Sequence, residues 1–421
     1  MDILLNSGST LVIIAAVVGL FMAWGIGAND VANAMGTSVG SKALTIKQAV
    51  IIAMVFEFAG AYLAGGEVTS TIRKGIIDAS FFVDSPELLV FGMISALFAA
   101  ATWLLIASAL GWPVSTTHSI VGAIVGFAAM GVSVDAVEWS KVSGIVGSWI
   151  ITPLISGIIA FIIFNSAQKL IFDTKKPLQQ AKRWVPLYMF LAGFVLALVT
   201  IKKGLKHLDL HIGNVDGFIY AVITAVIVAI IGKVFINRLK FDESAALKTH
   251  YANVEKVFAI LMIVTACAMA FAHGSNDVAN AIGPLAAVVS IVDNGGQIAA
   301  KSTIAWWILP LGGFGIVAGL AIFGHKVMAT IGTGITHLTP SRGFAAELAA
   351  ACTVVIASGA GLPISTTQTL VGAVLGVGMA RGIAAINLGV VRNIVVSWVI
   401  TLPVGAGLSI IFFWLMKSIF V

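Results

Sequence analysis

The chain has 421 residues and a mean hydropathy of +1.06, with 59% hydrophobic and only 10% charged residues. Soluble globular proteins carry about 25% charged residues, so this composition excludes an ordinary soluble fold. The net charge of +6 does not indicate nucleic-acid binding, because the basic residues lie between apolar runs, where the positive-inside rule of membrane proteins accounts for them.

Long stretches of the sequence contain no Asp, Glu, Lys or Arg. A membrane-spanning helix needs about 20 apolar residues, and most of these stretches reach that length. The charge-free runs are 3–29, 88–134, 142–168, 257–276, 302–325, 348–380 and 393–416. We therefore predict an all-α polytopic membrane protein whose core forms inside the lipid bilayer.

The sequence also repeats itself at a nearly constant distance along the chain. Three blocks return in the same order: GANDVANAMG at 27–36 as GSNDVANAIG at 274–283, PVSTTHSIVGAIVG at 113–126 as PISTTQTLVGAVLG at 363–376, and SWIITP at 148–153 as SWVITLP at 397–403. Internal repeats of this kind indicate a duplicated architecture. We predict a first transmembrane repeat at 9–165, a second at 255–417, and a two-segment insert at 166–254.

The number of segments predicts how the two repeats are oriented. We count five apolar segments in each repeat and two in the insert, about 12 membrane segments in all, some of them broken or re-entrant. In this count 113–130 is a full crossing, and the alternative is that it is re-entrant. Because five is odd, the second repeat starts on the opposite side of the membrane, and the repeats are inverted. In this arrangement the inner loops carry 15 Lys and Arg and the outer loops 8, which predicts that both termini lie outside.

The GANDVANA motif places a carboxylate deep in an apolar segment. Asp30 follows the charge-free run 3–29. Ionisable residues at that depth in a membrane segment are rare and usually functional, so we take Asp30 as part of a functional site. Asn33 lies four residues after Asn29, on the same helical face. Gly25 and Gly27 precede the motif, and we expect the helix to unwind there and turn free backbone carbonyls toward a cavity or an ion.

Carboxylate, amide and backbone oxygens are hard ligands, which suit Na⁺ better than softer metals. The second copy supplies the same set after Gly274. The predicted sodium ligands are Asn29, Asp30, Asn33, Asn276, Asp277 and Asn280. The alternative is that these side chains only join helices through hydrogen bonds.

The PVSTTH motif has the pattern of a helix start within the membrane, with a proline before a run of hydroxyl residues. Hydroxyl donors beside the unpaired N–H groups of a helix N-terminus form an anion site. The two copies supply Ser115, Thr116, Thr117, Ser365, Thr366 and Thr367. Two opposed helix N-termini can then hold a tetrahedral oxyanion, whereas ordinary N-capping, the alternative, needs a single Ser or Thr.

Four further polar residues lie in or beside these segments. His118 and Gln368 occupy the same position in the two copies. Because a polar contact is what the two share, we assign both to the anion site, with a proton relay through His118 as the alternative. Glu57 and Glu347 lie in apolar stretches but are not equivalent in the repeat. Each is either a further cation ligand or gate, or a helix-to-helix hydrogen-bond partner.

Small residues recur after the hydroxyl motif in both copies. Gly122 and Gly126, and likewise Gly372 and Gly376, form small-xxx-small patterns, which are typical of closely packed membrane helices. The tryptophans form no cofactor motif, and we expect no organic cofactor.

The duplicated NDVAN block, together with PVSTTH and PISTTQ, resembles the paired signatures of the PiT-type inorganic phosphate transporters. The resemblance covers both repeats and implies an inverted-repeat helical transporter that takes up inorganic phosphate with Na⁺ or, in some members, H⁺. It carries over to the Asn-Asp pairs at 29–30 and 276–277 and to the hydroxyl triplets at 115–117 and 365–367.

The residues by themselves agree with this resemblance, because secondary transporters bind substrate near the midplane between inverted repeats. We predict a non-enzymatic secondary transporter in the plasma membrane that couples uptake of inorganic phosphate to Na⁺ by alternating access. Its expected partners are phosphate, sodium ions and the lipid bilayer. The sequence is compatible with a homo-oligomer but does not require one. A proton-coupled phosphate or sulfate transporter of the same fold is the alternative. An intramembrane aspartyl protease, with two aspartates sharing a proton, is the less favoured alternative.

Overall fold

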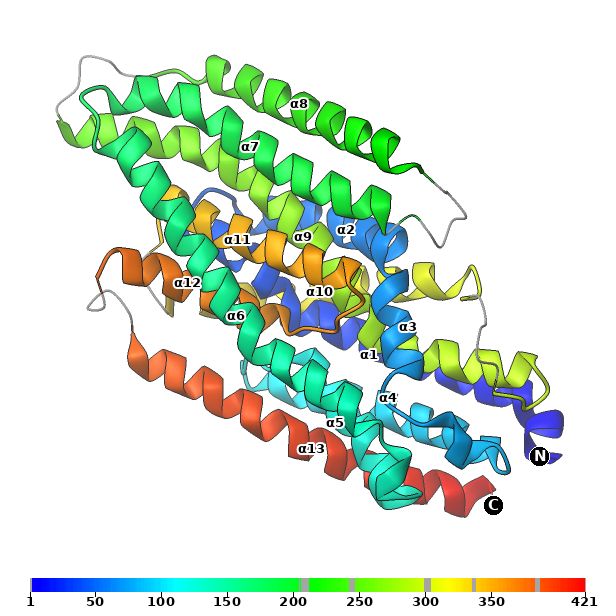
Figure 1. The fold of residues 1–421 in the computed structure, drawn as a ribbon. Coiled ribbons are helices and arrows are strands. Elements are labelled where there is room, and N and C mark those ends of the chain that lie inside the picture. Colours follow the sequence, from blue (N-terminus) through cyan, green and yellow to red (C-terminus); the bar gives the residue numbers. More distant parts are fainter. Residues whose placement is uncertain are drawn as a thin grey trace.

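The computed structural model describes residues 2–203, 205, 212–241, 247–298, 304–334, 338–382 and 387–420. Within these ranges the chain is almost wholly helical and forms an elongated bundle (Figure 1). Nine of the described helices are long and apolar enough to cross a membrane, and three shorter apolar helices accompany them. The all-α membrane fold with about 12 segments is therefore confirmed.

The elements follow one another in the order that the apolar runs predict. The first part contains α1 (Asp2–Gly40), α2 (Ile46–Ala64), α3 (Gly66–Lys74), η1 (Ala79–Phe82), α4 (Pro86–Ala109), α5 (Thr116–Gly131), η2 (Val134–Ala136), α6 (Trp139–Ala167) and η3 (Gln168–Phe172). The insert contains α7 (Pro177–Lys202) and α8 (Asn214–Arg238). The last part contains α9 (Leu247–Asp293), α10 (Ile308–Gly334), α11 (Pro340–Gly359), α12 (Thr366–Ala380) and α13 (Leu388–Phe420).

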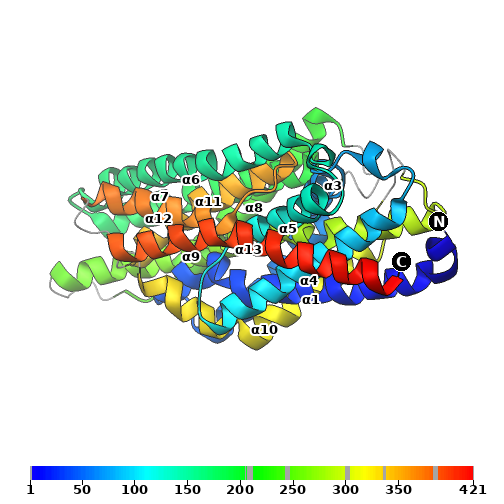
Figure 2. The ribbon, with the colours of Figure 1, turned by 90° about the horizontal axis from the view of Figure 1, so that it is seen from below.

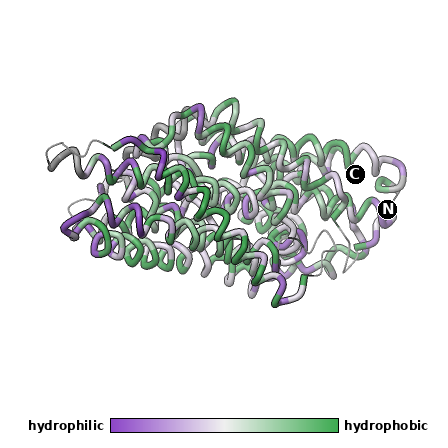
Figure 3. The backbone as a smooth tube through the Cα atoms, turned by 90° about the horizontal axis from the view of Figure 1, so that it is seen from above, coloured by the Kyte–Doolittle hydropathy of each residue, from purple (hydrophilic) through white to green (hydrophobic). Residues whose placement is uncertain are grey.

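Hydrophobic residues dominate the middle of the bundle, and hydrophilic residues gather toward its two ends (Figure 3). This distribution matches a bundle whose long axis runs across a membrane. The two ends of the chain lie close together at one end of the bundle (Figures 1 and 2). The chain therefore crosses the bundle an even number of times, as the segment count predicts.

Two helical hairpins, α4–α5 and α11–α12, enter the bundle from opposite ends (Figures 1 and 2). Gly111 and Gly361 adopt φ values of 69° and 71° in the two turns, a conformation that glycine takes without steric cost. With 16 and 15 residues, α5 and α12 are shorter than the roughly 20 residues that a crossing needs. Of the two alternatives for 113–130, the structure therefore favours the re-entrant one. Both hairpins return to the end where they began, which leaves the parity unchanged.

Each hairpin packs its second arm against a helix from the other part of the chain, α5 against α13 and α12 against α6. A Cβ atom at Gly126 would lie 2.6 Å from the Ala406 Cα atom, and one at Gly376 would lie 2.0 Å from the Gly157 carbonyl oxygen. Only a residue without a side chain allows this approach, so the prediction that the small-xxx-small patterns pack helices closely is confirmed.

The expected unwinding before the two NDVAN motifs does not occur. Both α1 and α9 continue as regular helices through the motif. The glycines there serve close packing instead: a Cβ atom would lie 1.9 Å from the Ile316 carbonyl oxygen at Gly27, and 2.1 Å from the Glu57 carbonyl oxygen at Gly274. The helices therefore supply side chains, and not freed backbone carbonyls, to the centre of the bundle.

This packing generates a stability prediction. Gly27→Ala adds a methyl group where α1 meets the α10 backbone, so the two helices must separate, at a cost of about 2 kcal/mol or more. Gly147→Ala is the matched control, since nothing lies within 4 Å of its added Cβ atom in α6. We expect thermal unfolding in detergent to begin at a clearly lower temperature for Gly27→Ala only. Equal unfolding temperatures would show that this contact is not needed.

Candidate functional site

The two NDVAN motifs meet at the centre of the bundle, where α1 and α9 lie beside the tips of both hairpins. One ligand atom each of Asp30, Asp277 and His273 lies within 4.8 Å of the others. All three side chains are at most 1% exposed. The sequence predicts two sodium sites, one per repeat, and the structure brings their carboxylates into one buried cluster.

Asn29 and Asn276 hold the turn of the hairpin that follows each of them in the chain. The Asn29 amide Nδ2 donates to Ser108 Oγ at 2.9 Å and to the Trp112 carbonyl at 3.2 Å. The Asn276 amide repeats this pattern, donating to Ser358 Oγ at 2.9 Å and to the Leu362 carbonyl at 3.1 Å. The two amide groups therefore join helices, which is the alternative that the sequence left open. The Asn276 Oδ1 atom stays without a hydrogen-bond partner.

Asn33 and Asn280 reach across to the other hairpin. Asn33 Nδ2 donates to Thr367 Oγ1 at 2.7 Å, and Asn280 Nδ2 donates to Thr117 Oγ1 at 3.1 Å. Asn280 also donates to Thr116 Oγ1 at 3.3 Å. The candidate cation motif of each copy therefore contacts the candidate anion motif of the other copy.

The carboxylates accept hydrogen bonds from the same hydroxyl triplets. Thr366 Oγ1 donates to Asp277 Oδ2 at 2.7 Å, and Thr367 Oγ1 lies 3.3 Å from Asp30 Oδ1. The two candidate ligand sets, for a cation and for an anion, thus form one continuous polar site inside an apolar bundle.

The serines of the triplets have a different task from the threonines. Ser115 Oγ accepts from the His118 backbone N–H at 3.2 Å, and Ser365 Oγ accepts from the Gln368 backbone N–H at 3.2 Å. These are ordinary N-caps of α5 and α12. The N-capping alternative therefore describes the two serines, while the four threonine hydroxyls, of Thr116, Thr117, Thr366 and Thr367, contact the site.

Several buried oxygen atoms at this centre have no hydrogen-bond partner. They are Asp30 Oδ2, Asn276 Oδ1, Asp277 Oδ1 and Asn280 Oδ1. A buried polar atom left unpaired costs free energy, so such a group of oxygens fits a bound hard cation. Gln368 Oε1 and His118 Nε2 are also buried and unpaired, on the side of the hydroxyl triplets.

His118 lies against two tryptophans as well as the site. Its Nδ1 atom is 3.4 Å from the Trp398 carbonyl oxygen, and its ring centroid is 3.8 Å from that of Trp149. These contacts give it the structural, polar role that the comparison with Gln368 favours.

The sequence analysis missed His273. Its Nε2 atom lies 3.0 Å from Asp277 Oδ2, and its Nδ1 atom lies 3.2 Å from Glu57 Oε1, with all three side chains fully buried. The signal was present, since His273 precedes Asp277 by one helical turn, but Ile26 stands at the matching position of the first copy. A search for repeated polar residues passes over it.

The two glutamates lie in different surroundings. Glu57 belongs to the central cluster through His273. Glu347 accepts hydrogen bonds from the Thr37, Ser38 and Thr265 hydroxyls, and both of its carboxylate oxygens are thereby satisfied. Glu347 thus has helix-to-helix hydrogen bonds, one of the two roles that the sequence left open.

Comparisons with known proteins bear on this geometry. The family model of the phosphate transporter family matches residues 26–409. A Haemophilus influenzae protein named as a phosphate permease is 59% identical over 423 residues, which cover 100% of both chains. The chloroplastic inorganic phosphate transporter 2-1 of Arabidopsis thaliana is 44% identical, over 95% of this chain and 71% of that protein.

A solved structure described as the sodium-dependent phosphate transporter aligns with a TM-score of 0.89 and 42% identity, over 97% of this chain and 100% of that chain. The relatives are transporters and not enzymes, so the protease hypothesis is wrong and the resemblance read from the duplicated motifs is confirmed. The chain belongs to the phosphate transporter family.

Proposed function

We propose that the chain takes up inorganic phosphate together with Na⁺ by alternating access. One observation carries the proposal: two threonine hydroxyls at the start of α12 donate to the two buried carboxylates, Thr366 to Asp277 and Thr367 to Asp30. An anion held by the hydroxyls and a cation held by the carboxylates are then direct neighbours. Each ion offsets the cost of burying the other.

In this proposal, phosphate binds between the N-termini of α5 and α12. The threonines donate hydroxyl hydrogen bonds, and the helix ends add backbone N–H groups and a favourable dipole. His118 and Gln368 supply polar contacts through Nε2 and Oε1, while Ser115 and Ser365 shape the helix ends. In the contacts described for this centre, no Lys or Arg side chain takes part, so bound cations must neutralise the phosphate.

We assign the sodium ions to the oxygens left unpaired around Asp30 and Asp277. The Asn276 and Asn280 amide oxygens complete this set, whereas Asn29 and Asn33 act mainly by holding the hairpins. The relative described as sodium-dependent supports Na⁺ as the coupling ion.

We further propose that residues 9–165 and 255–417 are inverted repeats related by a pseudo-two-fold axis in the membrane plane, with 166–254 as the insert. Two matching sets of hydrogen bonds support this symmetry. Asn29 and Asn276 make equivalent bonds in the two repeats, and so do Asn33 and Asn280. Two hairpins that meet tip to tip from opposite ends give each side of the membrane its own route to the site, as alternating access requires.

A proton-coupled transporter is the second candidate, and His273 favours it. A neutral imidazole has one N–H and can donate to only one of its two carboxylate neighbours. Both contacts are satisfied only when the group of His273, Glu57 and Asp277 holds one additional proton. Uptake into proteoliposomes with a Na⁺ gradient at fixed pH, compared with a pH gradient without Na⁺, separates the two candidates.

The carboxylates generate the first functional prediction. Asp30→Asn or Asp277→Asn removes the negative charge that attracts Na⁺, so we expect Na⁺-driven phosphate uptake to fall by at least about 100-fold, the effect of losing a few kcal/mol of binding. Asp216→Asn, on the exposed start of α8, is the control and should retain wild-type uptake. Full Na⁺ dependence in both site variants would disprove the assignment.

The anion choice generates a second prediction. Phosphate near neutral pH keeps a P–OH proton, and the unpaired acceptors Asp277 Oδ1 and Gln368 Oε1 can receive it. Sulfate has no such proton and would leave an acceptor facing a negative oxygen, a mismatch that discriminates better than size. We expect excess sulfate to compete weakly with labelled phosphate. Equal inhibition by sulfate and unlabelled phosphate would instead favour the sulfate transporter.

We also propose that the protein lies in the plasma membrane with both termini outside. The positive-inside rule favours this orientation, because the basic loops gather at the end opposite the termini. On a Cys267→Ala/Cys352→Ala background, a membrane-impermeant maleimide added to intact cells should label Asn6→Cys and Ser418→Cys. It should not label Lys176→Cys. Labelling of Lys176→Cys alone would reverse the orientation.

A further inference from the structure

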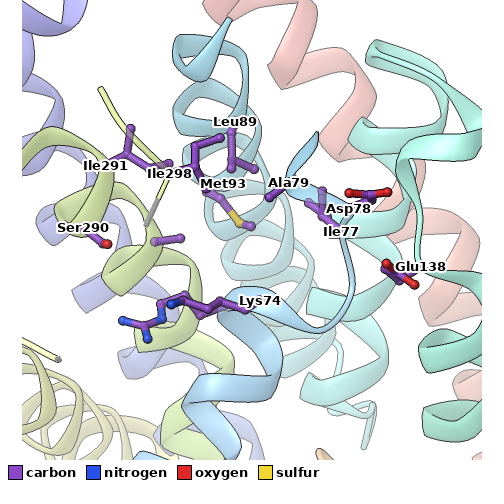
Figure 4. A pocket seen from close by; sticks show the side chains of 12 residues that line it. Lys74, Ile77, Asp78, Ala79, Leu89, Met93, Glu138, Ser290, Ile291 and Ile298 are labelled. Carbon is purple, nitrogen blue, oxygen red and sulfur yellow. The ribbon is translucent and has the colours of Figure 1, made fainter. Parts of the chain in front are cut away.

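A cavity of about 350 Å³ opens near the end of the bundle that carries the chain termini (Figure 4). It lies between the end of α3, the outer half of α4 and the last turns of α9. Ser290, on its wall, lies 13 residues after Asp277 on the same helix, which is about 20 Å along the axis. The cavity is therefore separate from the central site.

The walls of this outer cavity carry opposite charges. Arg73 and Lys74, the last residues of α3, line it together with Ser290. Asp78 and Glu138 lie on the opposite side from Lys74 and Ser290 (Figure 4). The Ser80 backbone N–H donates to Asp78 Oδ1 at 2.9 Å and holds the pKa of that carboxyl below its usual range, so this wall stays negative. An anion in the cavity is thereby confined to the α3 side.

The basic wall has the chemistry of an oxyanion site. Arg73 lines the cavity and is 9% exposed. Its planar donors match the geometry of phosphate oxygens, Lys74 adds a second positive charge, and Ser290 offers a hydroxyl. In the contacts described for the central site, no such basic residue takes part.

The helix that carries both cations also closes the way inward. Ile72, next to Arg73, is 1% exposed, and its Cγ2 atom lies 2.5 Å from where a Cβ atom of Gly283 on α9 would be. Thr71 Oγ1 donates to the Gly361 carbonyl at 2.6 Å, in the turn that leads to Ser365 and Thr366. The helix α3 is short, with nine residues between Gly65 and Gly75.

We propose that the outer cavity is a second binding site for inorganic phosphate, held by Arg73, Lys74 and Ser290, from which the anion passes to the central site when α3 moves. The proposal rests on phosphate transport as the function of the chain. It adds a basic site on the outer route, where the protein itself supplies the positive charge before sodium ions do so at the centre.

Uptake kinetics in intact cells test the site from the outside. Lys74→Gln should raise the KM for phosphate about fivefold, the effect of losing one charge-assisted contact, and leave the maximal rate unchanged. Lys417→Gln, at the same end of the bundle but outside the cavity lining, should change neither. The proposal is overturned if Lys74→Gln has the KM of the control, or if only its maximal rate falls.

A second pair of variants distinguishes the loss of the positive charge from a loss of folding. Arg73→Lys keeps the positive charge and should raise the KM less than Arg73→Gln does, with both proteins purified in folded form. If Arg73→Gln does not fold, Lys74→Gln and Ser290→Ala decide the question. Equal KM values for Lys74→Gln, Ser290→Ala and Lys417→Gln contradict the site.

Equilibrium binding of labelled phosphate to purified protein distinguishes the two sites. The Asp30→Asn protein, with its central site impaired, should keep a weaker phosphate site that the Asp30→Asn/Lys74→Gln protein lacks. Equal binding by these two proteins, or none by either, overturns the proposal. Failure of the proposed function looks different, because the wild-type chain would then show no Na⁺-dependent phosphate uptake at all.

Discussion

The structure depends on how two buried carboxylates are stabilised inside an apolar bundle. Asp30 and Asp277 are at most 1% exposed, and burying a charge is costly unless it is paired. Their hydrogen-bond donors are the hydroxyls of Thr367 and Thr366, at the tip of the second hairpin, and the Asn33 amide. The short arms, their turns with positive φ, and the polar helix N-termini are all needed to bring those hydroxyls to the middle of the bundle. The same arrangement leaves other oxygens unpaired, which is what a site for ions requires.

The sequence predicts the site better than it predicts the backbone around it. Polar residues in charge-free runs, repeated at a constant offset, correctly identify residues that meet at the centre. A buried polar side chain without a partner costs free energy, so two matched copies indicate that the residues have partners there. Gly25 and Gly27 were misread, since a glycine in a membrane helix permits either unwinding or close packing. The carbonyl of Ile316, 1.9 Å from a Cβ atom at Gly27, decides for packing, and that contact joins segments nearly 300 residues apart.

His273 and Glu347 mark the other limit of sequence reasoning. The repeat reveals polar residues that are present in both copies. His273 is not among them, because the equivalent position in the first copy is Ile26. Glu347 is conspicuous as a lone carboxyl in an apolar segment, yet its three hydroxyl donors come from α1 and α9. Which partners satisfy a buried group depends on the tertiary arrangement of helices, and neither hydropathy nor spacing encodes that arrangement locally.

The exchange of hairpin arms between the two parts of the chain has a consequence for biosynthesis. The glycine face of α5 packs on α13, and α13 is synthesised long after α5. Until Leu388–Phe420 is inserted, the first hairpin lacks this packing partner. The first hairpin therefore stays without its packing partner until most of the chain has been made.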